Sequence, residues 1–143
     1  MDEQLYRLAK LVAYASQNKE KGTGDDLHAK LLDDIVANAH ELGIERPFLH
    51  FKEVALCGGD TDILFVDARE RIFLVEGKVI RNERKLPYGR IKLIKEQLLR
   101  HHFFFWDRYG LSAQLIGAYR YKGKRKITCY FLRQPDYVQS EIR

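Results

Sequence analysis

Cysteine, proline and long apolar runs are scarce in this sequence of 143 residues, which contains two cysteines and three prolines. Two thiols cannot build a disulfide framework, and Cys57 and Cys129 lack the close spacing of a zinc-binding motif. We therefore expect buried thiols in a reducing compartment. No apolar run approaches the length that crosses a membrane, so we expect a cytoplasmic protein without a membrane partner.

The chain is instead rich in both apolar and charged residues. Hydrophobic residues make up 45% and charged residues 31%, a balance typical of a soluble globular protein. We expect a single domain over residues 1–143, with an N-terminal helix within 1–20 and a core within 22–133. The formal net charge of +5 permits a nucleic-acid partner without requiring one.

Apolar residues recur at helical spacing in three segments, and strand-type runs form five others. The patterns predict helices over 2–18, 25–42 and 90–109, and strands over 48–56, 62–67, 71–79, 113–121 and 126–133. Gly43 and Gly110 are placed to end the second and third helices. The order α-α-β-β-β-α-β-β predicts an α/β fold with a mixed central β-sheet flanked by helices.

The hairpin that follows Gly58 carries polar side chains where buried strands normally have apolar ones. With a three-residue loop, antiparallel pairing sets Leu64 against Leu74 and Asp62 against Glu76. Directly opposite residues share one face, with Cβ atoms about 5 Å apart, whereas a one-residue slip would move Asp62 to the other face. The favoured register therefore predicts two carboxylates together at one end of the sheet.

Lys78 lies two residues after Glu76 and therefore on the same face of its strand. Two carboxylates this close repel each other unless a positive charge lies between them, and Mg²⁺ prefers such hard oxygen ligands. Lys78 could orient or help deprotonate an attacking water, or stabilise charge on a phosphate. The set predicts metal-assisted hydrolysis of a phosphodiester, with Mn²⁺ able to substitute for Mg²⁺.

These residues resemble the PD-(D/E)XK nuclease superfamily, in which an acid on one strand is followed by Glu-x-Lys at the end of the next strand and then by a helix. Here the pattern is Asp62, then Glu76-Gly77-Lys78. The resemblance implies a restriction-endonuclease-like fold, Mg²⁺ dependence and cleavage of DNA. It also implies that Asp62 and Glu76 bind the metal and that Lys78 is catalytic. Gly77 stands where an apolar residue is commoner.

Other positions extend the resemblance or depart from it. Thr61 replaces the usual proline. Several branches place a glutamine on the helix after the lysine, which Gln97 matches, while His101 stands where one branch has a tyrosine. Archaeal Holliday-junction resolvases carry an acid near the start of the preceding helix. Asp25 or Asp26 could be that residue, and Asp26 is the third candidate metal ligand.

Simpler interpretations exist for the acids and the lysine. Asp62, Glu76 and Lys78 could form a cross-strand ion pair, although the apolar runs ILFV and IFLV beside them indicate burial, where charges need a reason. Asp60 fits a turn residue after two glycines. Glu53 fits a solvent-facing position better than a ligand.

The third helix has three features with competing interpretations. Gln97 lies beside the apolar stripe, so a packing role competes equally with a role in the site. His101 and His102 are adjacent, point in different directions and are interpreted as boundary residues. The aromatic run 103–106 covers more than one helix face, which favours burial against the N-terminal helix, with a dimer contact as the alternative.

Basic charge is clustered in two regions. Residues 78–100 hold eight Lys/Arg against two acids, and residues 119–133 hold basic side chains with no acid. Such runs usually form a solvated surface, but the first directly follows the Glu-x-Lys strand, which favours contacts with backbone phosphates. The best candidates for these contacts are Arg81, Arg84, Lys85 and Arg90.

We therefore expect a Mg²⁺-dependent DNA endonuclease that acts as a homodimer. Branched DNA is the substrate expected by analogy with junction resolvases of similar length. The alternative is a catalytically inactive nucleic-acid-binding or assembly module that retains the fold. Nothing in the residues excludes action on RNA.

Overall fold

The computed structural model describes residues 2–18, 25–56, 59–82, 88–132 and 139–142. The helices and strands of these residues follow one another in the predicted order, with one additional short helix and one additional strand. The elements are α1 (Glu3–Gln17), α2 (Asp26–Ala37), the 3₁₀ helix η1 (Ala39–Leu42), β1 (Leu49–Leu56), β2 (Gly59–Val66), β3 (Ile72–Ile80), α3 (Tyr88–Tyr109), β4 (Gln114–Tyr121), β5 (Thr128–Leu132) and β6 (Gln139–Ile142).

The predicted α/β class with a mixed sheet flanked by helices is confirmed. Six strands of the described residues lie in the order β1 to β6, with β3 and β4 parallel and the other neighbours antiparallel. The parallel pair is connected through α3, as a crossover requires. Strand β6 was not predicted, because four polar-rich residues give no alternating apolar signal.

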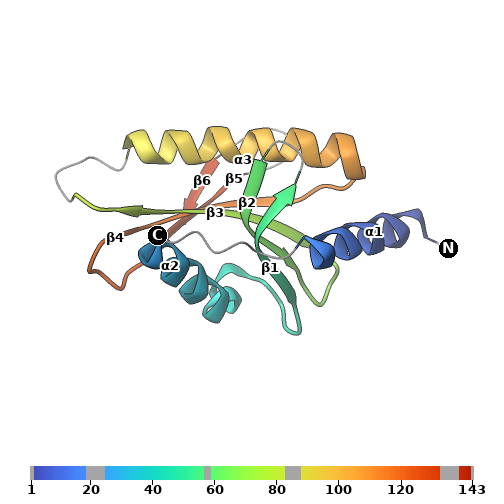
Figure 1. The fold of residues 1–143 in the computed structure, drawn as a ribbon, viewed down its shortest axis with the longest axis horizontal. Coiled ribbons are helices and arrows are strands. Elements are labelled where there is room, and N and C mark those ends of the chain that lie inside the picture. The colour runs from blue at the N-terminus through green and yellow to red at the C-terminus, as the bar shows by residue number, and fades with distance from the viewer. Residues whose placement is uncertain (1, 19–24, 57–58, 83–87, 133–138, 143) are drawn as a thin grey trace.

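Helices cover both faces of the sheet (Figure 1), with α3 along one face and α2 against the other. Each face has its own apolar core. Leu11, Leu74 and Leu98 belong to the core shared by α1 and α3, and Leu31 and Phe65 belong to the core under α2. Strand β3 contributes to both cores, and Glu76 on this strand is completely buried.

Helix α2 is shorter than predicted. It begins after Asp25, whose carboxylate accepts hydrogen bonds from the N–H groups of Leu27 and His28. It ends at Ala37 because the side-chain amide of Asn38 donates to the carbonyl of Asp34 and competes with the helical backbone. The 3₁₀ helix that follows ends at a glycine in the left-handed conformation, as predicted.

The loop between β2 and β3 has the predicted length. Asp67 N–H donates to the carbonyl of Arg71, and Glu70 takes the left-handed φ of 63° that such a three-residue loop needs. The buried carboxylate of Asp67 accepts from the N–H groups of Arg69, Arg71 and Glu45 and from the Arg71 guanidinium. The loop therefore fixes the register of the two strands that carry the candidate site.

The aromatic run on α3 divides between core and surface. Phe105 is buried in the core that α1 also enters, whereas Phe103, Phe104 and Trp106 are exposed. The predicted burial is thus confirmed for one of the four positions, because a helix turns only part of such a run inward. Among the described residues, no helix combines the length and the apolar character that crossing a membrane requires.

Cys129 is half-buried beside the core under α2. Burial, with a smaller contribution from the charge of Glu41, raises the pKa of its thiol to about 11. The thiol is therefore protonated and unreactive near neutral pH. Cys57 lies outside the described residues.

Candidate active site

Strands β2 and β3 separate at the predicted acid. The predicted pairing of Leu64 with Leu74 is confirmed. The backbone ladder does not continue to the predicted pair of Asp62 with Glu76 in the part of the chain that the structure describes. Instead, the N–H of Gly77 donates to Oδ2 of Asp62 over 2.8 Å. The acceptor is therefore a side-chain carboxylate and not a backbone carbonyl of β2.

The alternation of β1 and β2 breaks at the same point, which sequence periodicity did not reveal. Glu53 of β1 has a φ of 53°. Its neighbours Lys52 and Val54 pair with Ile63 and Thr61 of β2, but Glu53 does not pair with Asp62, which lies opposite it. As a result, the Thr61 hydroxyl lies 3.3 Å from Nδ1 of His101 on α3, while Asp62 contacts His28 on α2. The two carboxylates therefore approach each other through the opening between β2 and β3, and do not both project from one face as predicted.

Glu76 is completely buried and short of partners. Neither carboxylate oxygen has a hydrogen-bond partner among the described residues, and Nε2 of His101 lies 3.5 Å from Oε1. Burial first, and then the negative charge of Asp62, raise the pKa of Glu76 well above its usual value. A buried carboxylate in this position needs a proton or a cation beside it.

Asp62 is held in its ionised form. Burial opposes ionisation, but hydrogen bonds from His28 and from the N–H of Gly77 outweigh it and lower the pKa of Asp62. Its Oδ2 lies 3.4 Å from Nε2 of His28. Two adjacent acids with pKa values moved in opposite directions form the electrostatic centre of the site.

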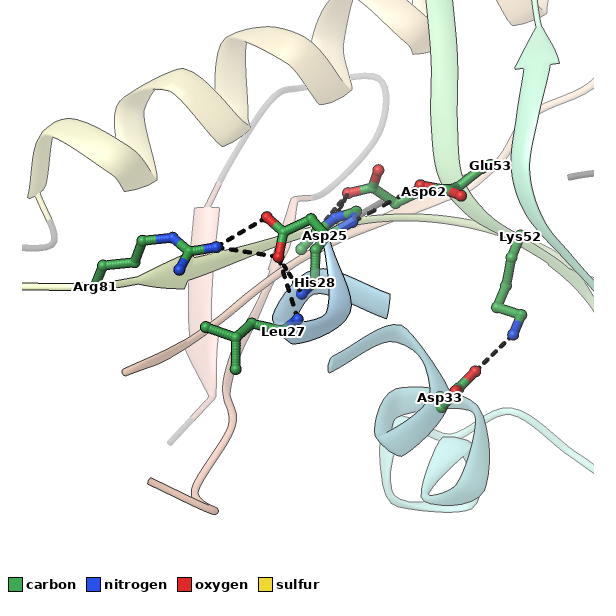
Figure 2. Close-up of polar contacts among 9 residues, drawn as sticks. Asp25, Leu27, His28, Asp33, Lys52, Glu53, Asp62 and Arg81 are labelled. Carbon is green, nitrogen blue, oxygen red and sulfur yellow. Dashed lines mark hydrogen bonds and ion pairs between the residues drawn. The ribbon is translucent and has the colours of Figure 1, made fainter. Parts of the chain in front are cut away.

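His28 lies between two carboxylates (Figure 2). Its Nε2 faces Asp62, and its Nδ1 lies 3.8 Å from Oε1 of Glu53. The hydrogen bond with Asp62 raises the pKa of His28, which favours the imidazolium form. The interpretation of Glu53 as a solvent-facing residue is wrong, because its side chain is only 15% exposed and points at this histidine.

Gly77 and Lys78 complete the strand end. A Cβ on Gly77 would lie 3.3 Å from Leu31 and 3.4 Å from Leu32, so Gly77 faces α2. Glu76 and Lys78 therefore face the opposite side, as predicted. Lys78 is half-buried, and its charge opposes the rise in the pKa of Glu76. The tight fit under α2 explains why a glycine occupies the position between the acid and the lysine.

The remaining predicted site residues are less closely placed. Gln97 is half-buried on α3, one turn before His101 and on the same side of the helix. Asp26 is exposed at the first position of α2, and the residue of that turn that contacts Asp62 is His28. Its neighbour Asp25 caps the helix.

Arg81, predicted to contact phosphate, is exposed and donates to both carboxylate oxygens of Asp25 over 3.1 Å (Figure 2). Each of the other predicted phosphate contacts stays a prediction. Arg84 and Lys85 lie outside the described residues, and Arg90 is placed by its backbone in the first turn of α3.

Two histidines of the site were missed by the reasoning from sequence, although each carried a signal. His28 shares the apolar stripe of α2 with Leu31, Leu32 and Ile35. His101 continues the spacing of Ile94, Leu98 and Phe105 on α3, and it is 4% exposed, so the prediction of a boundary position is wrong. A histidine within a buried stripe that faces a sheet indicates a polar partner on that sheet.

The donor set fits a hard divalent cation in part. Asp62 and Glu76 offer carboxylate oxygens, and those of Glu76 are buried with no hydrogen-bond partner among the described residues. Within those residues, however, no three His, Cys, Asp or Glu side chains form a ready-made metal cage. A cation here would keep water or substrate oxygens as its other ligands, and Mg²⁺ is usually bound in this way in proteins.

No protein-family model and no curated protein matches the chain. Among solved structures, the chain is similar to a crystal structure of a repair endonuclease from Pyrococcus abyssi, with 16% sequence identity and a TM-score of 0.46. The similarity covers 71% of this chain and 40% of that one, so the chain spans less than half the length of the protein it matches. Any function assigned to the chain therefore depends on the geometry of its own residues.

Proposed function

We propose that the protein is a Mg²⁺-dependent endonuclease that hydrolyses phosphodiester bonds in DNA. The observation that carries this proposal is the state of Glu76. It is fully buried, has no hydrogen-bond partner for either carboxylate oxygen in the described chain, and lies beside a second carboxylate, Asp62. Two adjacent buried carboxylates lower stability unless a proton or a cation lies beside them, and a bound divalent cation would stabilise the pair.

Asp62 and Glu76 would hold the metal, since both present oxygen atoms at the opening between β2 and β3. The bound ion supplies Lewis-acid activation of the phosphate and of a water molecule. His28 and the Gly77 N–H keep Asp62 ionised without the metal, so one ligand is prepared in advance. His101 lies against Glu76 and limits where that carboxylate can turn.

Lys78 supplies the positive side chain next to the reacting phosphate. It projects from the face that carries Glu76, where an ammonium group can orient the attacking water and stabilise charge on the phosphoryl oxygens. Water contributes the oxygen of the new P–O bond, and one P–O ester bond breaks. One proton of that water ends on the leaving alkoxide and the other passes to solvent.

The test is hydrolysis by Glu76→Gln and Lys78→Ala variants in Mg²⁺. Each is expected to lower the single-turnover rate by about 10²-fold or more, because each removes a group that acts on the transition state. Glu45→Gln and Lys10→Ala, at exposed positions, serve as matched controls and should cleave like the wild type. Mg²⁺-dependent cleavage that survives unchanged in either site variant would remove the assignment.

The preferred DNA structure is the finer part of the proposal. We propose branched DNA such as a four-way junction, by analogy with nucleases of similar length. Labelled linear, nicked, flap and four-way substrates of the same sequence, offered at equal concentration, would rank the preference. Equal rates on all of them would contradict it, and single-stranded RNA in the same series tests the choice of DNA.

One observation favours a different function, a binding or assembly module without catalysis. No group of three potential ligands forms a metal cage within the described residues. Calorimetry with Mg²⁺ or Mn²⁺ on the wild type and on Asp62→Asn separates the two functions. An endonuclease should release or absorb heat on binding the metal and lose that signal in the variant, whereas a binding module has no need of a metal that depends on Asp62.

A further inference from the structure

A groove of about 570 Å³ lies between α2 and the turn that joins β4 to β5. Leu27 and Lys30 of α2 form one wall, and Arg120 with the turn residues after Tyr121 forms the other. Positive side chains dominate the lining. They are Lys30, Arg120, Lys122, Lys124 and Arg125.

Among the described residues that line the groove, Asp34 is the acid, and it is already engaged within the groove. Arg120 donates to Oδ2 of Asp34 over 2.6 Å, and its side chain is only 11% exposed. Lys30 and the turn residues Lys122, Lys124 and Arg125 are exposed. The Asp34 and Arg120 charges offset each other, so the groove presents a net positive surface to a ligand.

The groove begins next to the candidate site. Leu27 precedes His28, which contacts Asp62, and Val79 lies on the same face of β3 as Gly77, the face that α2 covers. Because β3 and β4 are parallel, the ends of both strands meet at one edge of the sheet, so the site and the basic turn share that edge. A chain-like anion that crosses this edge can contact both.

We infer that this groove binds the sugar–phosphate backbone of the DNA strand adjacent to the cleaved bond. The inference deepens the proposed function and rests on it for the identity of the polymer. Flexible lysines and an arginine on an exposed turn neutralise phosphates without reading base edges, so the contacts position the strand and carry no sequence preference.

The test is the salt dependence of DNA binding, measured by fluorescence anisotropy with wild-type protein in EDTA, where no metal-dependent cleavage occurs. The variant is Lys122→Ala/Lys124→Ala/Arg125→Ala. Its slope of log affinity against log salt should be shallower than that of the wild type by about 2 to 3, since each phosphate contact contributes about 0.9 on duplex DNA. Affinity at low salt should fall at least tenfold.

The matched control removes the same charge elsewhere. Lys10→Ala/Arg46→Ala/Arg69→Ala changes three exposed basic residues that do not line the groove, and its slope should stay near that of the wild type. Lys30→Glu changes the opposite wall and should also weaken binding, so the result does not depend on the turn folding correctly. Equal slopes for the groove variant and the control would overturn the inference.

Further measurements distinguish this inference from general binding of polyanions and from the proposed catalysis. Polyglutamate that competes as well as DNA at equal charge would overturn the assignment to nucleic acid. If the groove variant lowers the slope as expected but the wild type never cleaves DNA in Mg²⁺, the groove stands and the proposed catalysis fails. If the wild type cleaves and the slope is unchanged, the catalysis stands and the groove fails.

Discussion

At the scale of the residue, Glu76 is a carboxylate that is completely buried in the core. A fully buried carboxylate loses its hydration, and neither of its oxygens gains a hydrogen bond within the described chain. Asp67, also buried, shows the contrast, because it is surrounded by N–H donors and a guanidinium that lower its pKa in spite of burial. Asp67 therefore stabilises the hairpin, whereas Glu76 lowers the stability of the fold and leaves both carboxylate oxygens without a hydrogen bond from the described chain.

Replacing Glu76 with Gln should stabilise the metal-free protein at neutral and higher pH. The folded-state pKa of Glu76 is raised, so the folded state binds this proton more tightly than the unfolded state. The free energy of unfolding of the wild type therefore falls as the pH rises above about 4.5 toward the folded-state pKa, and the variant lacks this loss. Each unit by which the folded-state pKa of Glu76 exceeds the unfolded-state value should add about 1.4 kcal/mol to the advantage of the variant.

Urea unfolding in EDTA from pH 4 to pH 8 measures this difference. Subtracting the two stability curves removes the titration of the other groups. Glu45→Gln, at a half-exposed carboxylate, is the control for the removal of one negative charge. A Glu76→Gln difference that does not change with pH would show that Glu76 does not carry the assigned burial cost.

Much of the site was predictable at this scale, and the missing part has a definite cause. The shared face of Glu76 and Lys78 followed from strand parity, and the pairing of Leu64 with Leu74 followed from the length of the hairpin loop. The predicted pair of Asp62 with Glu76 did not follow, because the ladder ends before it. The break at Glu53 was not predictable, because a non-glycine residue with positive φ leaves no mark in the sequence. That break turns Asp62 toward His28, which is why the histidine was missed.

At the scale of the element, the contact between α2 and β3 sets the position of the strand that carries the acid and the lysine. Gly77 lies against Leu31 and Leu32, with no space for a branched side chain. The apolar stripe of α2 predicted which residues would face the sheet, but not that they would pack against a glycine on β3. Close packing of this kind depends on distances between elements, which local periodicity does not contain.

A double-mutant cycle tests this contact. Gly77→Val should cost about 1–3 kcal/mol through overpacking, and Leu31→Ala about 2–5 kcal/mol through a cavity. The two together should cost less than the sum by at least about 0.5 kcal/mol, because the valine fills part of the cavity. The measurement is the free energy of unfolding in urea.

Gly77→Val combined with Leu11→Ala, in the core on the other face of the sheet, provides the comparison and should be additive. Additive costs for the Gly77 and Leu31 pair as well would mean that the two positions do not press on each other.

At the scale of the whole molecule, α1 belongs to the apolar core on the face of the sheet that α3 covers. Leu8, Leu11 and Ala15 lie in the same cluster as Leu98 and Phe105 of α3. The guanidinium of Arg7 also donates to the carbonyl of Gly110 at the end of α3. The amphipathic pattern predicted the helix itself, and the aromatic run of α3 predicted burial against it, which is confirmed for Phe105.

Leu11→Ala should therefore destabilise the whole protein by about 2–5 kcal/mol, as expected for a completely buried leucine. Leu5→Ala on the same helix removes a side chain that is 42% exposed and should change the free energy of unfolding by less than about 0.5 kcal/mol. Circular dichroism and tryptophan fluorescence should report one transition for both variants. A small effect at Leu11 would mean that α1 is dispensable for the core.

Because the Gly77 N–H donates to Asp62, the NMR signal of this amide reports on the candidate site. Glycine amides occupy a separate region of a ¹⁵N-correlated NMR spectrum, and the chain has ten glycines. The signal of this amide depends on a side-chain carboxylate, where neighbouring strand amides depend on backbone carbonyls. One assigned peak therefore follows whatever happens at Asp62, such as protonation, arrival of a cation or displacement by a phosphate, with no label attached to the site.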